Sequence, residues 1–419
     1  MTGTGSPGDT EPGRRRADPR LITPGKGVRG AWTEFRRKSR SGELGSLPVI
    51  GGLVAIWLVF QSLDNTFLSP RNLSNLSVDI VGMGLIAVGI VFVLLVGDID
   101  LSIGSVSGLT AAAFAVLNVN HGVEEWLGVL IALLFGAAIG VVQGFFVARV
   151  GVPAFVVTLA GLLGWNGLML YIMGTDGSFA LDDEGLVATL TSHYFTGPGV
   201  AFGLAALSVA VCLATAVRER RRRVAAGLPA RPPRAIGLVT AALAVVAFSA
   251  AFALTQFQGM PLALLIFLAV LVGLDFLLRR TTYGRKVFAL GGGLEAARRT
   301  GINVVWVRIS VFTVSGTMAA AGGLFLASRI NSVGTTSGGG ELMIDVIAAA
   351  VIGGTSLFGG RGTPWSALLG VLVIQSIASG MALLGVAVAI QSMITGGVLL
   401  AAVVIDSLSR RLQTAHGRA

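Results

Sequence analysis

The chain has 419 residues, of which 53% are hydrophobic and 12% are charged, about half the charged fraction of an ordinary soluble domain. Its single cysteine, Cys212, excludes a disulfide framework and a zinc site of several cysteines, and its three histidines are too widely spaced to suggest a shared metal site. The net charge of +10 would suit nucleic acid or anionic lipid, so the placement of the basic residues decides what it means.

Residues 1–46 are polar and rich in arginine, and we identify no secretory signal peptide or cleavage site in them. We expect them to form a largely disordered cytoplasmic tail. Residues 47–406 are predominantly apolar, whereas residues 407–419 are again polar and basic. The sequence therefore predicts a transmembrane region over 47–406 between two cytoplasmic tails.

Apolar segments recur throughout residues 47–406, and most of them approach the roughly 20 residues that a helix needs to cross a bilayer. This pattern predicts an all-α polytopic membrane protein with about twelve transmembrane helices. The shorter segments leave re-entrant helices open as an alternative. The expected spans lie at about 47–63, 76–97, 101–119, 126–148, 153–173, 197–217, 236–254, 261–278, 306–328, 343–358, 363–384 and 386–406.

Basic residues concentrate in alternate loops between these spans. With the N-terminus inside, the inner loops include 218–235 and 279–305, and only Arg71 and Arg329 of the 31 Lys and Arg residues lie in outer loops. The outer loops instead carry acidic residues. Because cytoplasmic loops attract Lys and Arg, this asymmetry predicts that both termini are cytoplasmic. Topology also explains the arginine clusters without nucleic acid as a partner.

The stretch GDIDLSIGSVSGL, residues 97–109, places Asp98 and Asp100 at the turn between the second and third spans. A carboxylate within hydrocarbon costs about 2.5–3.5 kcal/mol, so it needs a purpose. Asp100 or Ser102 could cap the first N–H groups of the next helix, and a helix broken at glycine could line a translocation path. Capping and direct contact with a substrate both stay open. A catalytic role lacks a nearby base or nucleophile.

A second glycine-rich break, VIGGTSLFGGRGTPW at 351–365, contains Thr355 and Ser356. It lies in the opposite half of the chain from the first break, which suggests an internal duplication. A tight interhelical turn of small residues would give the same pattern. Upstream, Glu341 and Asp345 stand at the outer start of the tenth span.

Four polar side chains stand alone inside apolar spans, namely Gln143, Thr158, Asn166 and Gln375. Isolated amides and hydroxyls in membrane helices more often bond to another helix than to a ligand. We retain Asn166 beside the polar residues of the two breaks as a candidate for substrate contact. The candidate residues of the translocation pathway are therefore Asp98, Asp100, Ser102, Asn166, Glu341, Asp345, Thr355 and Ser356.

The inner loop at 283–308 differs from a passive linker. After three glycines, Glu295 begins a short helical pattern, Arg298 and Arg299 lie in its last turn, and Gly301 ends it. This charge order matches the helix dipole, and a glycine stop is common. Because so short a helix is marginal alone in water, it needs a surface to lie on, and its small, charged residues favour a protein groove. We predict a helix at about 294–301.

Four segments occur together in this chain: GDIDLSIGSVSGL, GVPAFVVTLAGL at 151–162, TTYGRKVFALGGGLEAARRTGI and ELMIDVIAAAVIGGTSLFGGRGT. In this order they resemble permease subunits of bacterial ATP-binding cassette importers that take up ribose, xylose and other monosaccharides. The resemblance runs from about residue 47 to residue 406. It is closest to xylose-type permeases, because an extra pair of spans and the arginine-rich loop precede the loop at 279–305.

The resemblance implies a transport subunit of the bacterial inner membrane that is not itself an enzyme. It implies a homodimer that receives a sugar, most simply a xylose-like pentose, from an extracytoplasmic binding protein. A cytoplasmic ATPase, with two fused nucleotide-binding halves or as a dimer, would hold ATP and Mg, and this chain would hold no cofactor or metal. The residues that match the family's ATPase-coupling pattern are Glu295, Ala296, Ala297, Arg298 and Gly301.

The resemblance also implies an inverted repeat that pairs spans two to five with spans nine to twelve and centres the pathway between them. The sequence contains no Walker-type loop of the form GxxxxGK[ST], so any ATP would bind to another polypeptide.

An ion-coupled secondary transporter is the main alternative, because about twelve spans fit that class and Asp98 and Asp100 could couple to an ion. The predicted helix at 294–301 would then have no purpose. A membrane enzyme is a third possibility, but it would need a nucleophile, base or metal beside the carboxylates. Within the importer class, nucleosides and branched-chain amino acids are alternative substrates.

Overall fold

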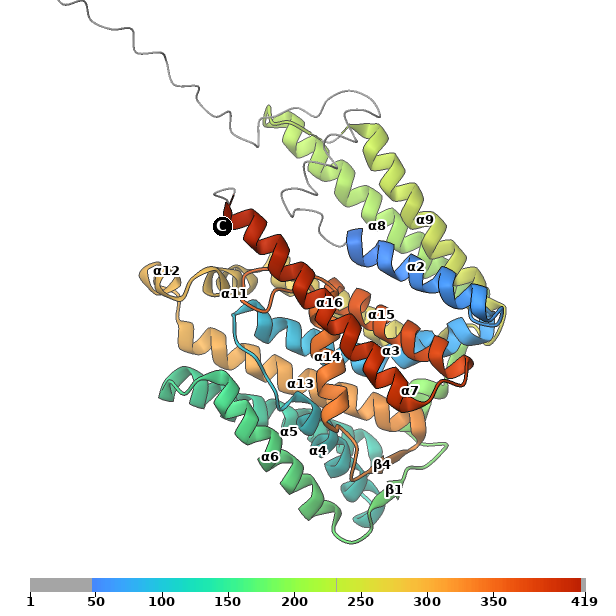
Figure 1. The fold of residues 1–419 in the computed structure, drawn as a ribbon, viewed down its shortest axis with the longest axis vertical. Coiled ribbons are helices and arrows are strands. Elements are labelled where there is room, and N and C mark those ends of the chain that lie inside the picture. Colours follow the sequence, from blue (N-terminus) through green and yellow to red (C-terminus); the bar gives the residue numbers. More distant parts are fainter. Residues whose placement is uncertain (1–46, 231, 416–419) are drawn as a thin grey trace, which may run out of the picture.

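The computed structural model describes residues 47–230 and 232–415, which fold into a bundle of helices (Figure 1). The predicted tail at 1–46 lies outside the described residues. The helices are α2 Leu47–Leu63, α3 Pro70–Leu95, α4 Ile103–Ala115, α5 Glu125–Phe145, α6 Ala154–Met173, α7 Leu186–Ser192, α8 Pro198–Ala225, α9 Pro233–Thr255, α10 Leu262–Arg280, α11 Thr282–Gly292, α12 Leu294–Arg299, α13 Val304–Ile330, α14 Gly340–Ile352, α15 Pro364–Leu383 and α16 Val388–Ala415.

Two pairs of short antiparallel strands connect loops of this bundle. Strand β1, Ser178–Ala180, pairs with β4, Ser332–Gly334. Strand β2, Tyr194–Phe195, pairs with β3, Met260–Pro261. Helices α11 and α12 lie together at one end of the bundle, and β1 and β4 lie at another (Figure 1). We refer to these as the α12 end and the β4 end.

Within the described ranges, nine helices are long and apolar enough to cross a membrane: α3, α4 with its π-helical extension Val116–Asn120, α5 with Phe146–Val150, α6, α8, α9, α10, α13 and α15. The other three expected spans fall on α2, α14 and α16. Helix α2 has 17 residues, and α16 has 28 residues and an apolar sequence as far as Ile405. Helix α14 has only 13 residues and ends at Ile352, so the expected span at 343–358 extends too far at its C-terminal end. The turn at Gly353 and Gly354 stops the helix, and 353–363 is not helical.

Two of the expected cytoplasmic loops are largely helical. The loop expected at 218–235 is divided between the end of α8 and the start of α9, with a short turn between them. The loop expected at 279–305 contains α11 and α12. Helix α16 continues to Ala415, beyond the expected end of the last span at 406.

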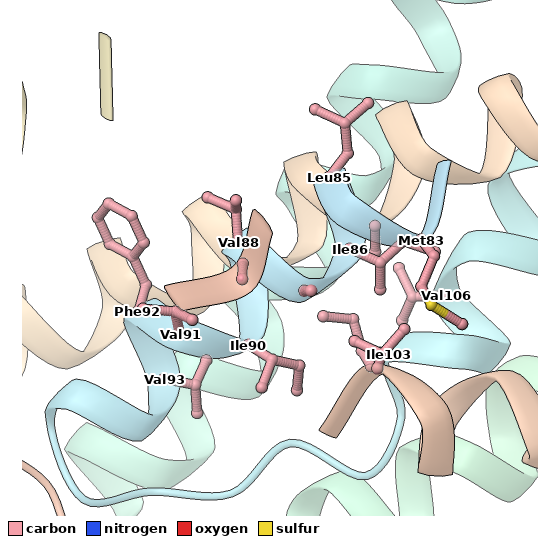
Figure 2. Packing of buried hydrophobic residues seen from close by; sticks show 14 of the residues in the cluster. Met83, Leu85, Ile86, Val88, Ile90, Val91, Phe92, Val93, Ile103 and Val106 are labelled. Atoms are coloured by element: carbon pink, nitrogen blue, oxygen red, sulfur yellow. The ribbon is translucent and has the colours of Figure 1, made fainter. Parts of the chain in front are cut away.

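Helix α3 lies at the centre of the molecule and is buried almost from end to end. Its sequence is apolar on every face, which is typical of a helix surrounded by other helices. Leu85, Val88 and Phe92 project to one side of α3, and Ile90 and Val93 project to the other (Figure 2). All five side chains belong to one continuous hydrophobic core that α4, α5, α13, α14 and α15 complete.

Helix α13 runs antiparallel to α3 and is tied to it near both ends. Arg308 in the first turns of α13 pairs with Asp98, just after α3 ends. Near the end of α13, Arg329 pairs with Asp79 in the first half of α3, with 2.7 Å between Nε and Oδ1. Glycines allow close approach between these points, since a Cβ added at Gly322 would lie 2.5 Å from the Gly82 carbonyl oxygen.

Helix α5 also packs against α13, through glycines at positions 136, 140 and 144 of one helix face. A Cβ at Gly140 would lie 2.2 Å from the Phe312 carbonyl oxygen, and one at Gly136 would lie 2.4 Å from that of Gly316. Small residues four apart let membrane helices bring their backbones together. This seam therefore has no room for a larger side chain unless the two helices separate.

The order of helices α3 to α6 recurs in α13 to α16. Each set starts with a long helix, of 26 residues in α3 and 27 in α13, and continues with a helix of 13 residues, α4 or α14. Helix α4 packs against α13, and α14 packs against α3. Similarly, α5 packs against α13 and α15 packs against α3. Each set thus packs its second and third helices on the first helix of the other.

The two glycine-rich breaks, which suggested an internal duplication, do not occupy equivalent positions in this repeat. The first break separates α3 from α4, whereas the second separates α14 from α15. The segment equivalent to the first break is the stretch between α13 and α14, which contains β4. Sequence similarity between the breaks reflects their need for glycine rather than common position.

Candidate translocation site and coupling helix

The break between α3 and α4 buries a charge pair that the sequence analysis did not foresee. Asp98 is 8% exposed. Its Oδ1 accepts a hydrogen bond of 3.2 Å from Arg308 Nη2, and its Oδ2 lies 3.1 Å from Arg308 Nε. Arg308 belongs to α13, and its position in the sequence gave no sign of this partner, because 210 residues separate the two.

Asp100 is held by a separate hydrogen-bond network. Its Oδ1 accepts from the backbone N of Ser102 at 2.9 Å and from the Ser102 hydroxyl at 2.7 Å. Its Oδ2 accepts from the Ser315 hydroxyl at 3.3 Å. Ser102 Oγ in turn accepts from Gln143 Nε2 at 2.7 Å. Both carboxylate oxygens therefore have protein donors, and the network joins the break to α5 and α13.

Neither Asp100 nor Ser102 makes the expected side-chain hydrogen bond to the first N–H groups of the helix. Helix α4 starts at Ile103, and the side chain of its N-cap, Ser102, makes no capping hydrogen bond to the helix. The Asp100 carboxylate instead accepts from the N–H of Ser102 and lies before the positive end of the α4 dipole. A buried carboxylate in this position is stabilised by charge-assisted hydrogen bonds, so it needs no substrate to justify its presence.

The isolated polar residues of the spans behave largely as expected. Gln143 bonds to Ser102, Thr158 Oγ1 donates to the Ala154 and Ile99 carbonyls, and Gln375 Nε2 lies 3.9 Å from Met83 Sδ. These are contacts within or between helices and not free ligand donors.

The second break folds back against the first. Gly360 N donates to the Leu95 carbonyl at 2.9 Å, and Gly359 is close enough that a Cβ there would lie 3.0 Å from Gly97 N. Ser356 Oγ accepts from Phe358 N within its own loop. Thr355 is 1% exposed, and its Oγ1 has no hydrogen-bond partner within the described ranges. Thr355 and Ser356 therefore lie in the same region of the fold as Asp98.

Glu341 and Asp345 lie elsewhere, in a cavity of about 580 Å³ at the β4 end. The cavity is lined by serines, glycines and alanines, including Ser107, Ser332 and Ser337, and by the apolar side chains Leu326, Ile330 and Leu342. Glu341 Oε1 also accepts from Ser392 of α16 at 2.8 Å. Arg329 and Asn331, at the end of α13, do not bond to Glu341 or Asp345. Arg329 bonds to Asp79, and Asn331 bonds to Asp183.

The eight candidate pathway residues therefore fall into three places. Asp98, Asp100, Ser102, Thr355 and Ser356 surround the two breaks, and Glu341 and Asp345 line the cavity. Asn166 stands apart on the exposed face of α6. Helix α4 connects the first two places, because Ser102 lies at its start and Ser107 lines the cavity. Of the His, Cys, Asp and Glu side chains that the structure describes, no three cluster closely enough to hold a metal ion.

A short helix forms at α12, close to the predicted range of 294–301. Ala297 is 2% exposed and faces the bundle, whereas Glu295 and Arg298 have side chains 73% and 60% exposed. Gly301 adopts the left-handed conformation, with φ of +77°, that ends such a helix. The preceding helix, α11, was not predicted, and its buried face of Gly284, Val287 and Leu290 seats it against the bundle. The charged residues of α12 and Ala296 are therefore presented to solvent.

The sequence did not identify three partners of this cluster: Arg308, which pairs with Asp98, Ser315, which bonds to Asp100, and Gln143, which bonds to Ser102. An arginine two positions inside an expected span was the available signal for Arg308, because a cation there requires a partner. Ser315 carries no such signal, since serine is tolerated in any membrane helix.

A protein family model described as "Branched-chain amino acid transport system / permease component" matches residues 72–403. The chain is 36% identical over 364 residues to the xylose transport system permease protein XylH of Escherichia coli (strain K12). The aligned region covers 87% of this chain and 92% of that protein. It is 30% identical over 374 residues to the ribose import permease protein RbsC of Bacillus subtilis (strain 168), covering 89% and 96%. It is also 30% identical over 401 residues to the L-arabinose ABC transporter permease protein AraH of Azospirillum brasilense, covering 94% of each. No solved structure matches the chain.

These similarities extend over nearly all of the helical region, including both breaks and α12. The nine apolar helices agree with the permease names of the relatives. This chain is therefore a multi-pass protein of the bacterial inner membrane that belongs to the family of branched-chain amino acid transport system permease components.

Proposed function

We propose that this chain is the membrane-spanning subunit of an ATP-binding cassette importer for a pentose. The names of three relatives specify xylose, ribose and L-arabinose, all of which are aldopentoses, and the identity to the xylose permease is the highest of the three. A xylose-like sugar is accordingly our preferred substrate. In this proposal the chain acts as a homodimer and performs no chemical step.

The single observation that carries the proposal is the position of α12. It is a six-residue helix in which Ala297 is buried, whereas Ala296 and the charged residues are exposed. A helix of this length gains little stability of its own, so its outward face is best explained as a docking surface. We propose that a cytoplasmic ATPase, which binds ATP and Mg, holds this face and moves α12 during hydrolysis.

The distribution of basic residues supports the orientation of the bundle. The arginine-rich end of α8 and the cationic residues of α11 and α12 fall on the side predicted to be cytoplasmic. The exchanged packing of the α3 and α13 sets supports an inverted repeat, because the first helices of the two sets run antiparallel. The α12 end would then be cytoplasmic, and the β4 end would face the extracytoplasmic binding protein.

The cavity at the β4 end supports the path of the sugar. Its volume of about 580 Å³ is within the roughly 300–1,000 Å³ of small-molecule sites. Hydroxyls and the carboxylates of Glu341 and Asp345 line it, which suits the hydroxyl groups of a sugar. We propose that this cavity receives the sugar and that α4 leads from it to the two breaks.

An ion-coupled carrier has less support from the same residues. A carrier needs an acid that can lose and regain a proton or bind an ion. Asp98 is paired with Arg308, and both oxygens of Asp100 accept hydrogen bonds from serines. Collapse of the proton gradient in whole cells with ATP intact distinguishes the two classes, because uptake persists in an ATP-driven importer and stops in a proton-coupled carrier.

The first test is transport by the purified components in lipid vesicles. We expect xylose uptake only when this chain, its cytoplasmic ATPase, the binding protein and ATP are all present. The measurement is the uptake of radiolabelled xylose, with ribose and arabinose as competing sugars. Uptake by the chain alone, without nucleotide, would contradict the proposal and favour ion coupling.

The second test is a bulky substitution on the exposed face of α12. Ala296→Trp is expected to leave membrane insertion intact and to weaken co-purification of the ATPase by about tenfold or more, because added bulk at a closely packed contact costs about 1–3 kcal/mol. The matched control is Ala225→Trp, at an exposed alanine in the last turn of α8. Equal ATPase binding by the two variants would show that α12 is not the docking helix.

A further inference from the structure

Both flanks of α12 reach the same short stretch of the chain, residues 95–98. On the N-terminal side, α11 ends at Gly292, and Gly291 packs against the end of α3. On the C-terminal side, α13 begins at Val304 and carries Arg308 to Asp98. The two flanks thus hold the first break, one by a backbone contact and the other by an ion pair.

The backbone contact at Gly291 is too close for any side chain. A Cβ added there would lie 1.8 Å from the Leu95 carbonyl oxygen and 2.6 Å from Gly360 N. The Leu95 carbonyl is also the acceptor for Gly360 N, at 2.9 Å. The ends of α11 and α3 and the second break therefore meet at one point, which we call the glycine junction and define as Gly291, Leu95 and Gly360.

The junction joins helices to non-helical segments. Residues 96–102 and 353–363 are the two breaks of the bundle, and their backbones adopt conformations that favour glycine, with φ of +84° at Gly97 and +74° at Gly360. Segments of this kind absorb the changes of backbone angle when helices move. The helices on either side are closely packed, so displacement concentrates at the breaks.

We propose that the glycine junction is the point through which motion of α12 is passed to both breaks together. The proposal rests on the proposed function and assigns Gly291 the role of a positioning residue for transport. Movement of α12 presses on the end of α3 at Gly291 and pulls on the first break through the Arg308–Asp98 pair, and the second break follows because Gly360 is bonded to Leu95. Docking of the ATPase involves the outward face of α12 and does not involve the junction.

The test compares two neighbouring glycines at the end of α11. Gly291→Ala places a methyl group against Leu95, whereas at Gly292, which is exposed, a Cβ would have nothing within 4 Å. In vesicles with the ATPase and binding protein, Gly291→Ala is expected to bind the ATPase normally but to lower xylose uptake per ATP hydrolysed by about tenfold or more, within the range of coupling between protein sites. Gly292→Ala is expected to match the unmodified chain. Normal uptake per ATP in Gly291→Ala, or equal losses in both variants, would overturn the proposal.

A second measurement covers the case in which Gly291→Ala does not fold. Hydrogen exchange of the unmodified complex, with and without a non-hydrolysable ATP analogue, reports local opening of the backbone. Exchange at residues 95–102 and 353–363 is expected to change together when the analogue binds. A change in only one of these segments, or in neither, would contradict the junction. Absence of ATP-dependent uptake by the unmodified complex would instead contradict the proposed function itself.

Discussion

Arg308→Met is expected to destabilise the folded protein by about 3 kcal/mol, because it leaves the Asp98 carboxylate buried without its counter-charge. The Asp98 side chain is only 9% exposed and that of Arg308 is 23% exposed, so water cannot replace the lost partner. Methionine keeps much of the apolar stem of arginine, which confines the effect to the charge. The measurement is the midpoint of thermal unfolding in detergent, together with the yield of folded protein from membranes.

The control is the same substitution at the other end of the same helix. Arg329 also pairs with an aspartate of α3, but the two side chains are 36% and 35% exposed. Arg329→Met is therefore expected to cost no more than about 1 kcal/mol, as exposed ion pairs usually do. Equal shifts in the two variants would mean that burial of the Asp98 pair contributes nothing to its strength.

The double variant Asp98→Leu/Arg308→Met separates stability from transport. Replacing a buried ion pair by apolar residues is often close to neutral, so most of the lost stability is expected to return. Transport per ATP hydrolysed is expected to stay low, because the ion pair between the start of α13 and the first break is gone and, within the described residues, only the Ser315–Asp100 hydrogen bond still joins them. A double variant that recovers both properties would show that the pair has only a structural role.

Gly140→Leu is expected to prevent folding, with a loss of at least about 3 kcal/mol, at the upper end of overpacking effects. The Cβ alone would lie 2.2 Å from the Phe312 carbonyl oxygen, so α5 and α13 would have to separate along the seam. That separation would also pull Gln143 away from Ser102, since Gln143 lies one turn further along α5. Size-exclusion profiles and thermal unfolding after membrane extraction measure the effect.

Gly164→Leu is the matched control, on a neighbouring membrane helix. Gly164 is exposed on α6, and a Cβ there would meet nothing within 4 Å. Leucine is a better helix former than glycine by up to about 1 kcal/mol, so this variant is expected to be neutral or slightly more stable. A failure of both variants would indicate that any added bulk is harmful to insertion, independent of the seam.

Much of the helical layout could be predicted because it depends on local patterns. Apolar length identified nine of the spans, and the order of Glu295, Arg298 and Gly301 identified α12. Helix α14 was overextended because residues 343–358 stay apolar after the helix has ended at Ile352. Hydropathy measures the environment of a segment and not whether its backbone is helical, so a break within apolar sequence escapes it.

The contacts around the first break could be predicted only in part. Asp98 and Asp100 are conspicuous because acids are rare in membrane segments. Their partners Arg308 and Ser315 come from a helix more than 200 residues away, and no spacing rule links positions so distant. The α5 seam was predictable in principle, because glycines at 136, 140 and 144 follow the small-xxx-small pattern, but that pattern does not name the facing helix.

The ion pairs between the α3 region and α13 can form only late in the synthesis of the chain. Asp98 and Arg308 are 210 positions apart, so at about 5–20 residues per second the acid waits roughly 10–40 s for its cation. Until α13 has been made, Asp79 within α3 and Asp98 just after it lack the arginines that pair with them in the folded protein.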